Sequence, residues 1–268
     1  STLLRTMADF ASGNGDLVES WEFARRSYEL EPESPKVINA MAQAWLNLEE
    51  YDKAEALLKT GLELASDNGE LKIQYFFLML VSSRMEEAER MVREQFDQDI
   101  ASLPDQFQRF YHYQMGLINL MKGNFTEARN EVAQSINEDE SQLFDGNQVM
   151  ALLMVAYLND KLGDEEDAEE SLLAAERVVR RARINGIDHA YIYYTESSIH
   201  ALRGQPEQAI ASLREAYDRG WRQSWMLEID GRLETLWEEP EFIAIKEQIK
   251  DDVNQARSEV LSETVAMF

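Results

Sequence analysis

The hydrophobic residues of this chain recur with the period of an α-helix, most clearly between residues 35 and 68. Four apolar side chains in the first half of this segment are spaced as on one helical face: Ile38, Met41, Ala42 and Trp45. A polar turn at residues 49–52 follows. The second half places five more side chains on one face: Ala54, Leu57, Leu58, Gly61 and Leu62. This pattern predicts a hairpin of two helices.

The hairpin pattern occurs six times along the chain. Each copy carries one small residue at a corresponding position: Ser20, Ala54, Ala88, Ala128, Ala168 and Ala209. The first two intervals between them are 34 residues, and the next three are 40, 40 and 41. A repeat of fixed length, extended by short insertions, indicates stacked helical hairpins. We therefore predict six repeats, at residues 1–34, 35–68, 69–102, 109–142, 149–182 and 190–223, connected by segments 103–108, 143–148 and 183–189.

Two local patterns refine this prediction. Gly123, Gly163 and Gly204 each follow a first helix, where a left-handed residue satisfies free carbonyl groups at little steric cost. The stretch from Asp164 to about Arg183 predicts an unusually long second helix, because its start is acidic and its end is basic.

The repeat resembles the tetratricopeptide family, whose 34-residue pattern has a small residue at position 8 and Ala at position 20. In the fourth repeat, Met115 and Gly116, followed by residues 122–128, come close to a family signature, whereas the third repeat is weakest, with Lys72 and Phe76 at atypical positions. The resemblance covers about residues 1–223 and implies an all-α, right-handed superhelix of six hairpins.

The remaining residues, 224–268, are predicted to form a helical cap. One helical stripe carries six apolar residues that could seal the end of the array: Phe242, Ile245, Ile249, Val253, Ala256 and Val260. The segment from Gly220 to Phe242 also looks like the tail of bacterial tetratricopeptide regions, which often follow a DNA-binding or signalling domain. No cap precedes Ser1, so we expect this chain to be the C-terminal part of a longer protein.

Composition narrows the possible functions. The net charge of −25 argues against direct binding of nucleic acid, since phosphate recognition needs basic residues. The same negative charge is typical of a solvated acidic surface, or it could attract a basic partner toward the protein. The sequence has no apolar run of about 18 residues, no secretory signal and no Cys. We expect a soluble protein and favour the cytoplasm over the periplasm, although a chain without Cys suits either.

The family resemblance implies a concave groove lined by the first helices of the repeats. Carried onto this chain, the groove positions hold ten large residues: Phe77, Phe110, Tyr113, Leu117, Leu120, Met150, Leu153, Tyr157, Tyr191 and Tyr194. Such a surface suits a peptide or helix of a partner protein. The alternative is that several of these residues belong to the core between repeats. A clamp for a peptide carboxylate is not expected, because only Arg5 fits it and Asp9 and Glu70 would repel the ligand.

One basic cluster interrupts the acidic chain: Arg177, Arg180, Arg181 and Arg183. These guanidinium groups could dock an acidic partner or a phosphate. The alternative is that Glu176 and Arg180 form an i,i+4 pair and that the cations only complement the helix end.

No catalytic motif is present, so we expect no enzyme activity, metal or cofactor. His112, His189 and His200 lack a metal-binding pattern, and His112 and His200 occupy positions typical of packed residues. The sequence therefore favours a protein-interaction module. Two alternatives remain: a sensory or regulatory domain whose output lies upstream, and an enzyme built on the array, which would need a deep pocket with paired carboxylates or a metal. Self-association through the groove or the cap is also open.

Overall fold

The computed structural model describes residues 1–96, 100–137 and 146–266, and within these ranges every regular element is a helix. The helices of the six predicted hairpins are α1 (Thr2–Gly13), α2 (Leu17–Leu30), α3 (Pro35–Asn47), α4 (Tyr51–Leu64), α5 (Gly69–Val81), α6 (Met85–Gln95), α7 (Asp105–Met121), α8 (Phe125–Ser135), α9 (Gly146–Leu162), α10 (Glu165–Ile184), α11 (Ala190–Leu202) and α12 (Pro206–Asp218). The short helix η1 (Ile100–Ser102) precedes α7, and the chain ends with α13 (Ser224–Ile229), η2 (Gly231–Leu236) and α14 (Pro240–Ala266).

The predicted repeats appear in order, but their connecting segments are shorter than expected. Helix α7 begins at Asp105, α9 begins at Gly146 and α10 continues to Ile184, so parts of all three predicted connections are helical. The predicted long second helix is confirmed by the 20 residues of α10. Residues 97–99 and 138–142 of the third and fourth repeats, 143–145 of one connection and 267–268 of the cap lie outside the described residues.

The chain divides into two compact units, each assembled from segments that are distant in sequence. Unit 1 contains Ser1–Ser82, Arg214–Ile229 and Glu239–Phe268, whereas unit 2 contains Ser83–Leu213 and Asp230–Glu238. The two units group residues that contact one another, whereas the predicted repeats (residues 1–223) and cap (residues 224–268) are consecutive stretches of sequence. The division into repeats and cap therefore stays a prediction.

Small side chains let the two helices of a hairpin approach closely. All six small residues that defined the repeat are buried: Ser20, Ala54, Ala88, Ala128, Ala168 and Ala209. The Ser20 hydroxyl donates a hydrogen bond of 2.9 Å to the Ala8 carbonyl on the facing helix. In the fourth repeat, a Cβ atom at Gly116 would lie only 2.3 Å from Val132 Cγ2. Larger residues at these positions would therefore separate the helices.

Each hairpin turns through one residue in the left-handed conformation. The prediction for three glycines is confirmed by φ angles of 78° at Gly123, 84° at Gly163 and 66° at Gly204. The turns of the second and third repeats use Glu49 (φ 56°) and Ser83 (φ 57°) in the same way. These two residues accept a conformation that L-amino acids otherwise avoid.

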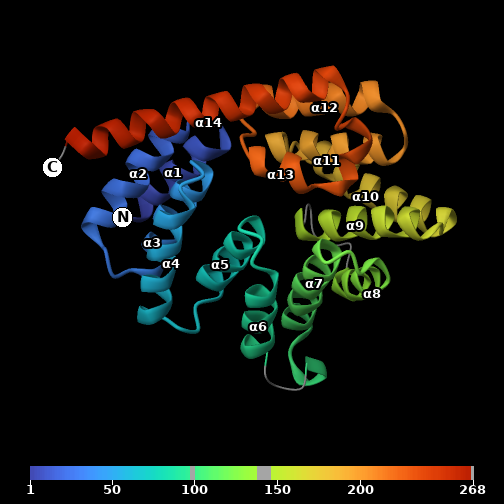
Figure 1. Cartoon of the computed structure of the whole chain (residues 1–268), viewed down its shortest axis with the longest axis horizontal. Helices are drawn as coiled ribbons and strands as arrows, with labels where there is room; N and C mark the ends of the chain where they lie inside the picture. Colours follow the sequence, from blue (N-terminus) through green and yellow to red (C-terminus); the bar gives the residue numbers. More distant parts are fainter. Residues whose placement is uncertain (97–99, 138–145, 267–268) are drawn as a thin grey trace. The chain divides into compact units, whose positions relative to one another are not determined.

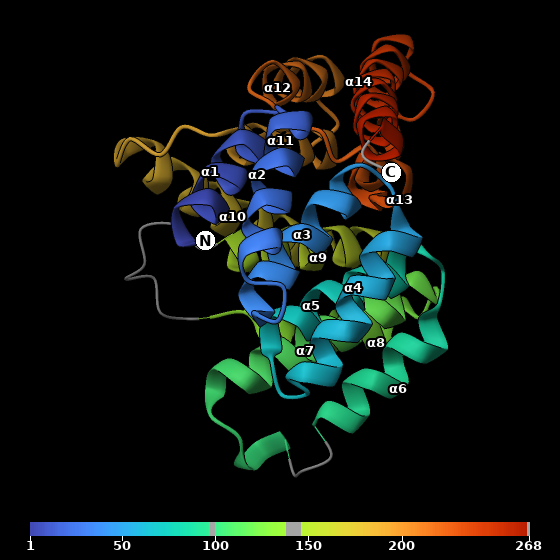
Figure 2. The same cartoon turned by 90° about the vertical axis from the view of Figure 1, so that its left-hand side faces the viewer.

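In unit 1 the C-terminal helix packs against the first repeats. Helix α14 (red in Figure 1) lies alongside α2, and α1, α2 and α3 are neighbours in Figure 2. Val253, Ala256 and Val260 of α14 share one core with Trp21 of α2 and Trp45 of α3. All six residues of the predicted apolar stripe are buried.

The C-terminal half of the stripe packs against the first repeat, where Val253, Ala256 and Val260 lie in one core with Trp21 of α2. Helix α14 also forms polar contacts with the last repeat: Arg214 donates to Gln248 at 2.7 Å, and the Tyr217 hydroxyl donates to Asp252 at 3.0 Å. The sealing of the last repeat by the stripe stays a prediction.

The turn geometry yields a stability prediction. We expect Gly123→Ala to lower the free energy of unfolding by about 1–2 kcal/mol, because an L-residue is strained at positive φ. Gly69→Ala is the matched control, since both glycines have open space around them but Gly69 has no positive φ. Urea unfolding followed by circular dichroism measures both; equal losses would contradict the role of the turn.

Candidate functional site

The ten residues predicted to line a groove are divided between the two units. Phe77 lies half-buried on α5 in unit 1, and its ring centroid is 5.6 Å from that of Phe76. The other nine lie in unit 2 on three first helices: Phe110, Tyr113, Leu117 and Leu120 on α7, Met150, Leu153 and Tyr157 on α9, and Tyr191 and Tyr194 on α11.

A segment of the chain itself lies against these first helices in unit 2. Helix η2 contacts α9 and α11. The Tyr157 hydroxyl donates to Glu234 at 3.3 Å, and a Cβ atom at Gly231 would lie 2.5 Å from the Tyr157 hydroxyl oxygen. Lys161 also forms an ion pair with Glu234. The start of η2 therefore fits closely on the inner residues of α9.

A buried ion pair anchors this segment. Arg232 donates from Nε to Asp230 Oδ1 at 2.7 Å and from Nη2 to Oδ2 at 2.6 Å, and both residues are buried. The buried Tyr194 hydroxyl donates to the same carboxylate, and Arg232 Nη1 lies 3.0 Å from the sulfur of Met150. The pair thus connects α9 and α11 through one chain segment.

The ion pair and its surroundings shift the pKa values of the site. Burial would lower the pKa of Arg232, but the Asp230 carboxylate and its hydrogen bonds raise that pKa above the ordinary value. Burial, followed by the negative charge of Asp230, raises the pKa of Tyr194 well above its usual value. Burial also raises the pKa of Tyr113, against the opposing effect of Arg232. Arg232 therefore stays charged and the tyrosines neutral.

This arrangement limits what the isolated chain presents to a partner. Met150, Leu153, Tyr157 and Tyr194 are buried in unit 2. Phe110, Tyr113, Leu117, Leu120 and Tyr191 are half-buried. A role for these residues in partner binding stays a prediction.

The four arginines of the predicted basic cluster lie in different surroundings, and their role in docking stays a prediction. Arg183 binds Glu196 through two hydrogen bonds of 2.8 and 2.6 Å and lies 4.2 Å from the centre of the Tyr193 ring. Its hydrogen bonds with Glu196 raise the pKa of Arg183 above the ordinary value. Arg181 is half-buried, whereas Arg177 and Arg180 are exposed. The predicted partner of Arg180 is wrong, because Glu176 pairs with Arg203.

The histidines have structural partners. His112 Nδ1 lies 2.7 Å from Glu131 Oε2, and His200 Nδ1 lies 2.9 Å from Gln205 Oε1. Burial lowers the pKa of His189. Across the ranges that the structure describes, no group of three or more His, Asp or Glu side chains is arranged to hold a metal ion.

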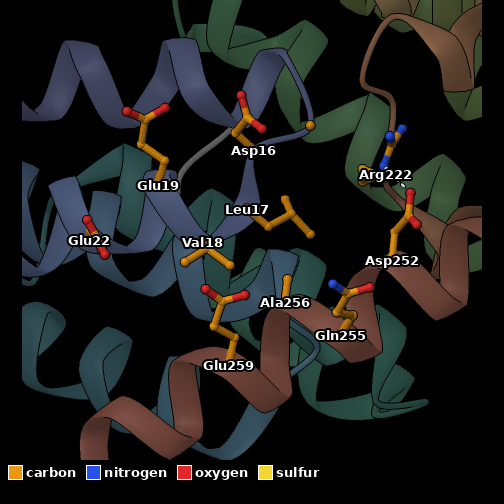
Figure 3. Close-up of a pocket in the computed structure, with 11 residues that line it drawn as sticks. Asp16, Leu17, Val18, Glu19, Glu22, Arg222, Asp252, Gln255, Ala256 and Glu259 are labelled. Carbon is orange, nitrogen blue, oxygen red and sulfur yellow. Dashed lines mark ion pairs between the residues drawn. The ribbon is translucent and has the colours of Figure 1, made fainter.

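Sequence reasoning missed an open groove between α2 and α14 in unit 1. Its cavity volume is about 510 Å³, and eleven residues line it: Gly15, Asp16, Leu17, Val18, Glu19, Glu22, Arg222, Asp252, Gln255, Ala256 and Glu259. In Figure 3, Leu17 and Val18 of α2 face Ala256 of α14 and form an apolar floor. We call this cavity the α2–α14 groove.

The rim of the α2–α14 groove is acidic. Arg222 and Asp252 neutralise each other, with Nε 3.0 Å from Oδ2 (Figure 3). Within the described part of the chain, the other rim carboxylates have no ion-pair partner: Asp16, Glu19, Glu22 and Glu259. Close backbone contact between Gly15 and Gly220 holds the Arg222 segment beside the start of α2. The groove therefore combines an apolar floor with uncompensated negative charge.

A smaller cavity of about 240 Å³ lies elsewhere in unit 1, between the turn before α4 and α13. The Ser224 hydroxyl donates to Glu49 there. Burial, together with the carboxylates of Glu49 and Glu228, raises the pKa of Tyr51 to about 12. Tyr51 thus stays protonated at neutral pH and serves as a packed polar residue.

Comparison with known proteins supports the fold. No family model and no curated protein matches this sequence. A tetratricopeptide repeat protein from Parabacteroides merdae is similar in structure, with a TM-score of 0.53 at 16% identity over 87% of this chain and 83% of that one. Weaker likenesses include pilF of Pseudomonas aeruginosa (TM-score 0.48, 15% identity, 89% and 96% covered) and MamA from Desulfovibrio magneticus RS-1 (TM-score 0.47, 15%, 67% and 94%).

The chain therefore has the all-α helical repeat fold of tetratricopeptide proteins. Among the helices that the structure describes, none combines the length and apolar character needed to cross a membrane.

The buried ion pair gives a second prediction. Asp230→Asn should lower the free energy of unfolding of unit 2 by about 3–5 kcal/mol, because it leaves the buried Arg232 charge unpaired. Asp230→Asn combined with Arg232→Met should lose less, since no unpaired charge remains. Urea unfolding compares the two variants, and a larger loss in the double variant would contradict the proposed cause.

Proposed function

We propose that this protein is a protein-interaction module whose α2–α14 groove holds a basic segment of a partner. The observation that carries the proposal is the pairing of an apolar floor with four rim carboxylates that lack ion-pair partners among the described residues. Lysine and arginine side chains suit such a groove, because their long stems cover apolar surface while their charges reach the rim. The tetratricopeptide fold supports an interaction role in general.

The net charge of the chain favours the same class of partner. At −25, the protein attracts cationic segments over the range that salt leaves unscreened, and this raises the rate of encounter. Contacts with Leu17, Val18 and Ala256 would then slow dissociation, because the apolar surface buried in the complex is exposed to water again when the partner leaves. This role fits a free-standing adaptor as well as the regulatory part of a larger protein.

The first helices of unit 2 give less support to an aromatic docking groove. Residues 230–236 already contact Met150, Tyr157 and Tyr194 there. A partner would have to displace this segment, together with its buried ion pair, before it reached those side chains. The α2–α14 groove requires no such displacement.

The test uses a fluorescein-labelled synthetic peptide with Lys and Leu on opposite faces of a helix. We expect the triple variant Glu19→Gln, Glu22→Gln, Glu259→Gln to weaken its binding at least about tenfold in fluorescence anisotropy, which corresponds to about 1.4 kcal/mol. The matched control removes the same number of charges from exposed positions on α10, through Glu165→Gln, Glu166→Gln and Asp167→Asn.

Two outcomes decide the proposal. If the control triple loses as much affinity as the groove triple, net charge alone explains the binding and the groove proposal fails. The variant Val18→Asn probes the floor and should lower affinity while leaving the salt dependence unchanged, because it removes apolar contact and no charge. Circular dichroism of every variant verifies that the fold is intact.

A further inference from the structure

The exposed side of helix α10 carries a symmetric arrangement of charge. Five residues spaced by three, four, four and three positions lie on one face of this helix: Glu166, Glu169, Leu173, Arg177 and Arg180. All five are exposed, and the buried residues of α10 lie on the opposite face. The acids lie four and seven positions before Leu173, and the arginines lie four and seven positions after it. We call these five residues the α10 stripe.

The two arginines of the α10 stripe have no ion-pair partner among the residues that the structure describes. Side chains three or four positions apart can pair along a helix, and the only carboxylate at such a distance from Arg177 or Arg180 is that of Glu176, which binds Arg203. The stripe therefore keeps two cations available, although acidic residues outnumber basic ones by 51 to 26 in this chain. Six other arginines of unit 2 pair with carboxylates of their own chain: Arg84, Arg93, Arg129, Arg183, Arg203 and Arg232.

The helix dipole accounts for only part of this pattern. Acids are favourable in the first turn of a helix and bases in the last, and the effect fades within one turn. Glu169 already lies in the second turn of α10, and Arg177 lies seven residues before its end at Ile184. The dipole also gives no reason for Leu173, midway between the charges and 45% exposed. A second surface that pairs with the stripe accounts for all five residues.

The acidic and basic halves of the stripe cannot reach each other within one chain. Glu166 and Arg180 are 14 positions apart, which is about 21 Å along a helix. When two copies of α10 lie antiparallel with their Leu173 residues opposite each other, Glu166 of each copy faces Arg180 of the other, and Glu169 faces Arg177. Every charge of the stripe then meets its opposite, and the two helix dipoles are also antiparallel. A parallel pairing would bring like charges together.

We propose that α10 is a dimerisation surface, on which a second copy of this chain binds antiparallel about a twofold axis at Leu173. A twofold interface uses the same patch on both copies, so the patch must be complementary to itself, as the α10 stripe is. Repulsion between two chains of charge −25 is limited, because salt largely screens exposed charges more than about 8 Å apart at physiological ionic strength. A contact along one helix of each copy lies below the size of a standard interface, about 1,200 Å² or more, so the dimer dissociates readily. The stripe lies in unit 2 and is separate from the α2–α14 groove.

Sedimentation equilibrium of the full chain at physiological ionic strength tests this proposal, at protein concentrations up to about 1 mM. We expect a monomer–dimer equilibrium. The variant Arg177→Glu, Arg180→Glu and the variant Glu166→Arg, Glu169→Arg should each weaken self-association at least about tenfold, because like charges then face each other. An equimolar mixture of the two variants should form dimers again, since one stripe is then wholly acidic and the other wholly basic.

A matched control separates the stripe from net charge. The variant Arg26→Glu, Arg90→Glu changes the net charge as much as the reversal of the two stripe arginines does, at exposed positions outside α10. It should leave the dimer intact. Circular dichroism of every variant verifies that the fold is retained.

Cross-linking tests the register. The chain has no Cys, so Leu173→Cys introduces a single thiol, and a short bismaleimide should join two copies at this position. Glu166→Cys should react far less, because its two copies lie about 21 Å apart in the antiparallel dimer. The proposal is overturned if the unaltered chain stays monomeric throughout, if mixing the two reversed variants restores no dimer, if the matched control weakens association as much as the reversals do, or if Glu166→Cys cross-links as well as Leu173→Cys.

Discussion

The close approach of the two helices of a hairpin is the constraint on which the remaining structure depends. In the first, second, fourth and fifth repeats, a buried Ala or Ser at the start of the second helix keeps the paired helices close, and Gly116 within α7 does the same in the fourth. Each hairpin in turn forms the surface on which the next one packs. A single methyl group at Gly116 would therefore disturb its own hairpin first and the interface with the following repeat second.

Two consecutive segments after the repeats have different roles. Residues 230–238 cover the first helices of unit 2 with a buried ion pair, whereas α14 covers the second helix of the first repeat in unit 1. The first segment covers part of the surface that the family resemblance predicted as a groove, through its contacts with Met150, Tyr157 and Tyr194. The second creates a new concave surface, because α14 meets α2 along Ala256 and leaves acidic residues at the rim. The location of the accessible surface thus depends on the tail as much as on the repeats.

Local patterns were predictable from the sequence, and contacts between distant segments were not. The six hairpins, the left-handed glycines and the length of α10 follow from residues a few positions apart. The α2–α14 groove brings together Glu19 and Glu259, which are 240 positions apart, and nothing in the repeat pattern links them. Acidic residues at helical spacing beside an apolar stripe on α2 were the available signal. Asp230 and Arg232 carried no signal, because their burial depends on α9 and α11.

The discontinuous make-up of unit 1 sets the order in which the protein can fold during synthesis. Residues 1–82 are synthesised well before α14 (Pro240–Ala266), the helix that covers Trp21 and Ala24. At about 5–20 residues per second, the early helices wait roughly 10–40 s for that covering helix. Throughout this interval an apolar face of α2 remains exposed to solvent. Nascent chains therefore offer chaperones a binding surface that α14 buries in the completed fold.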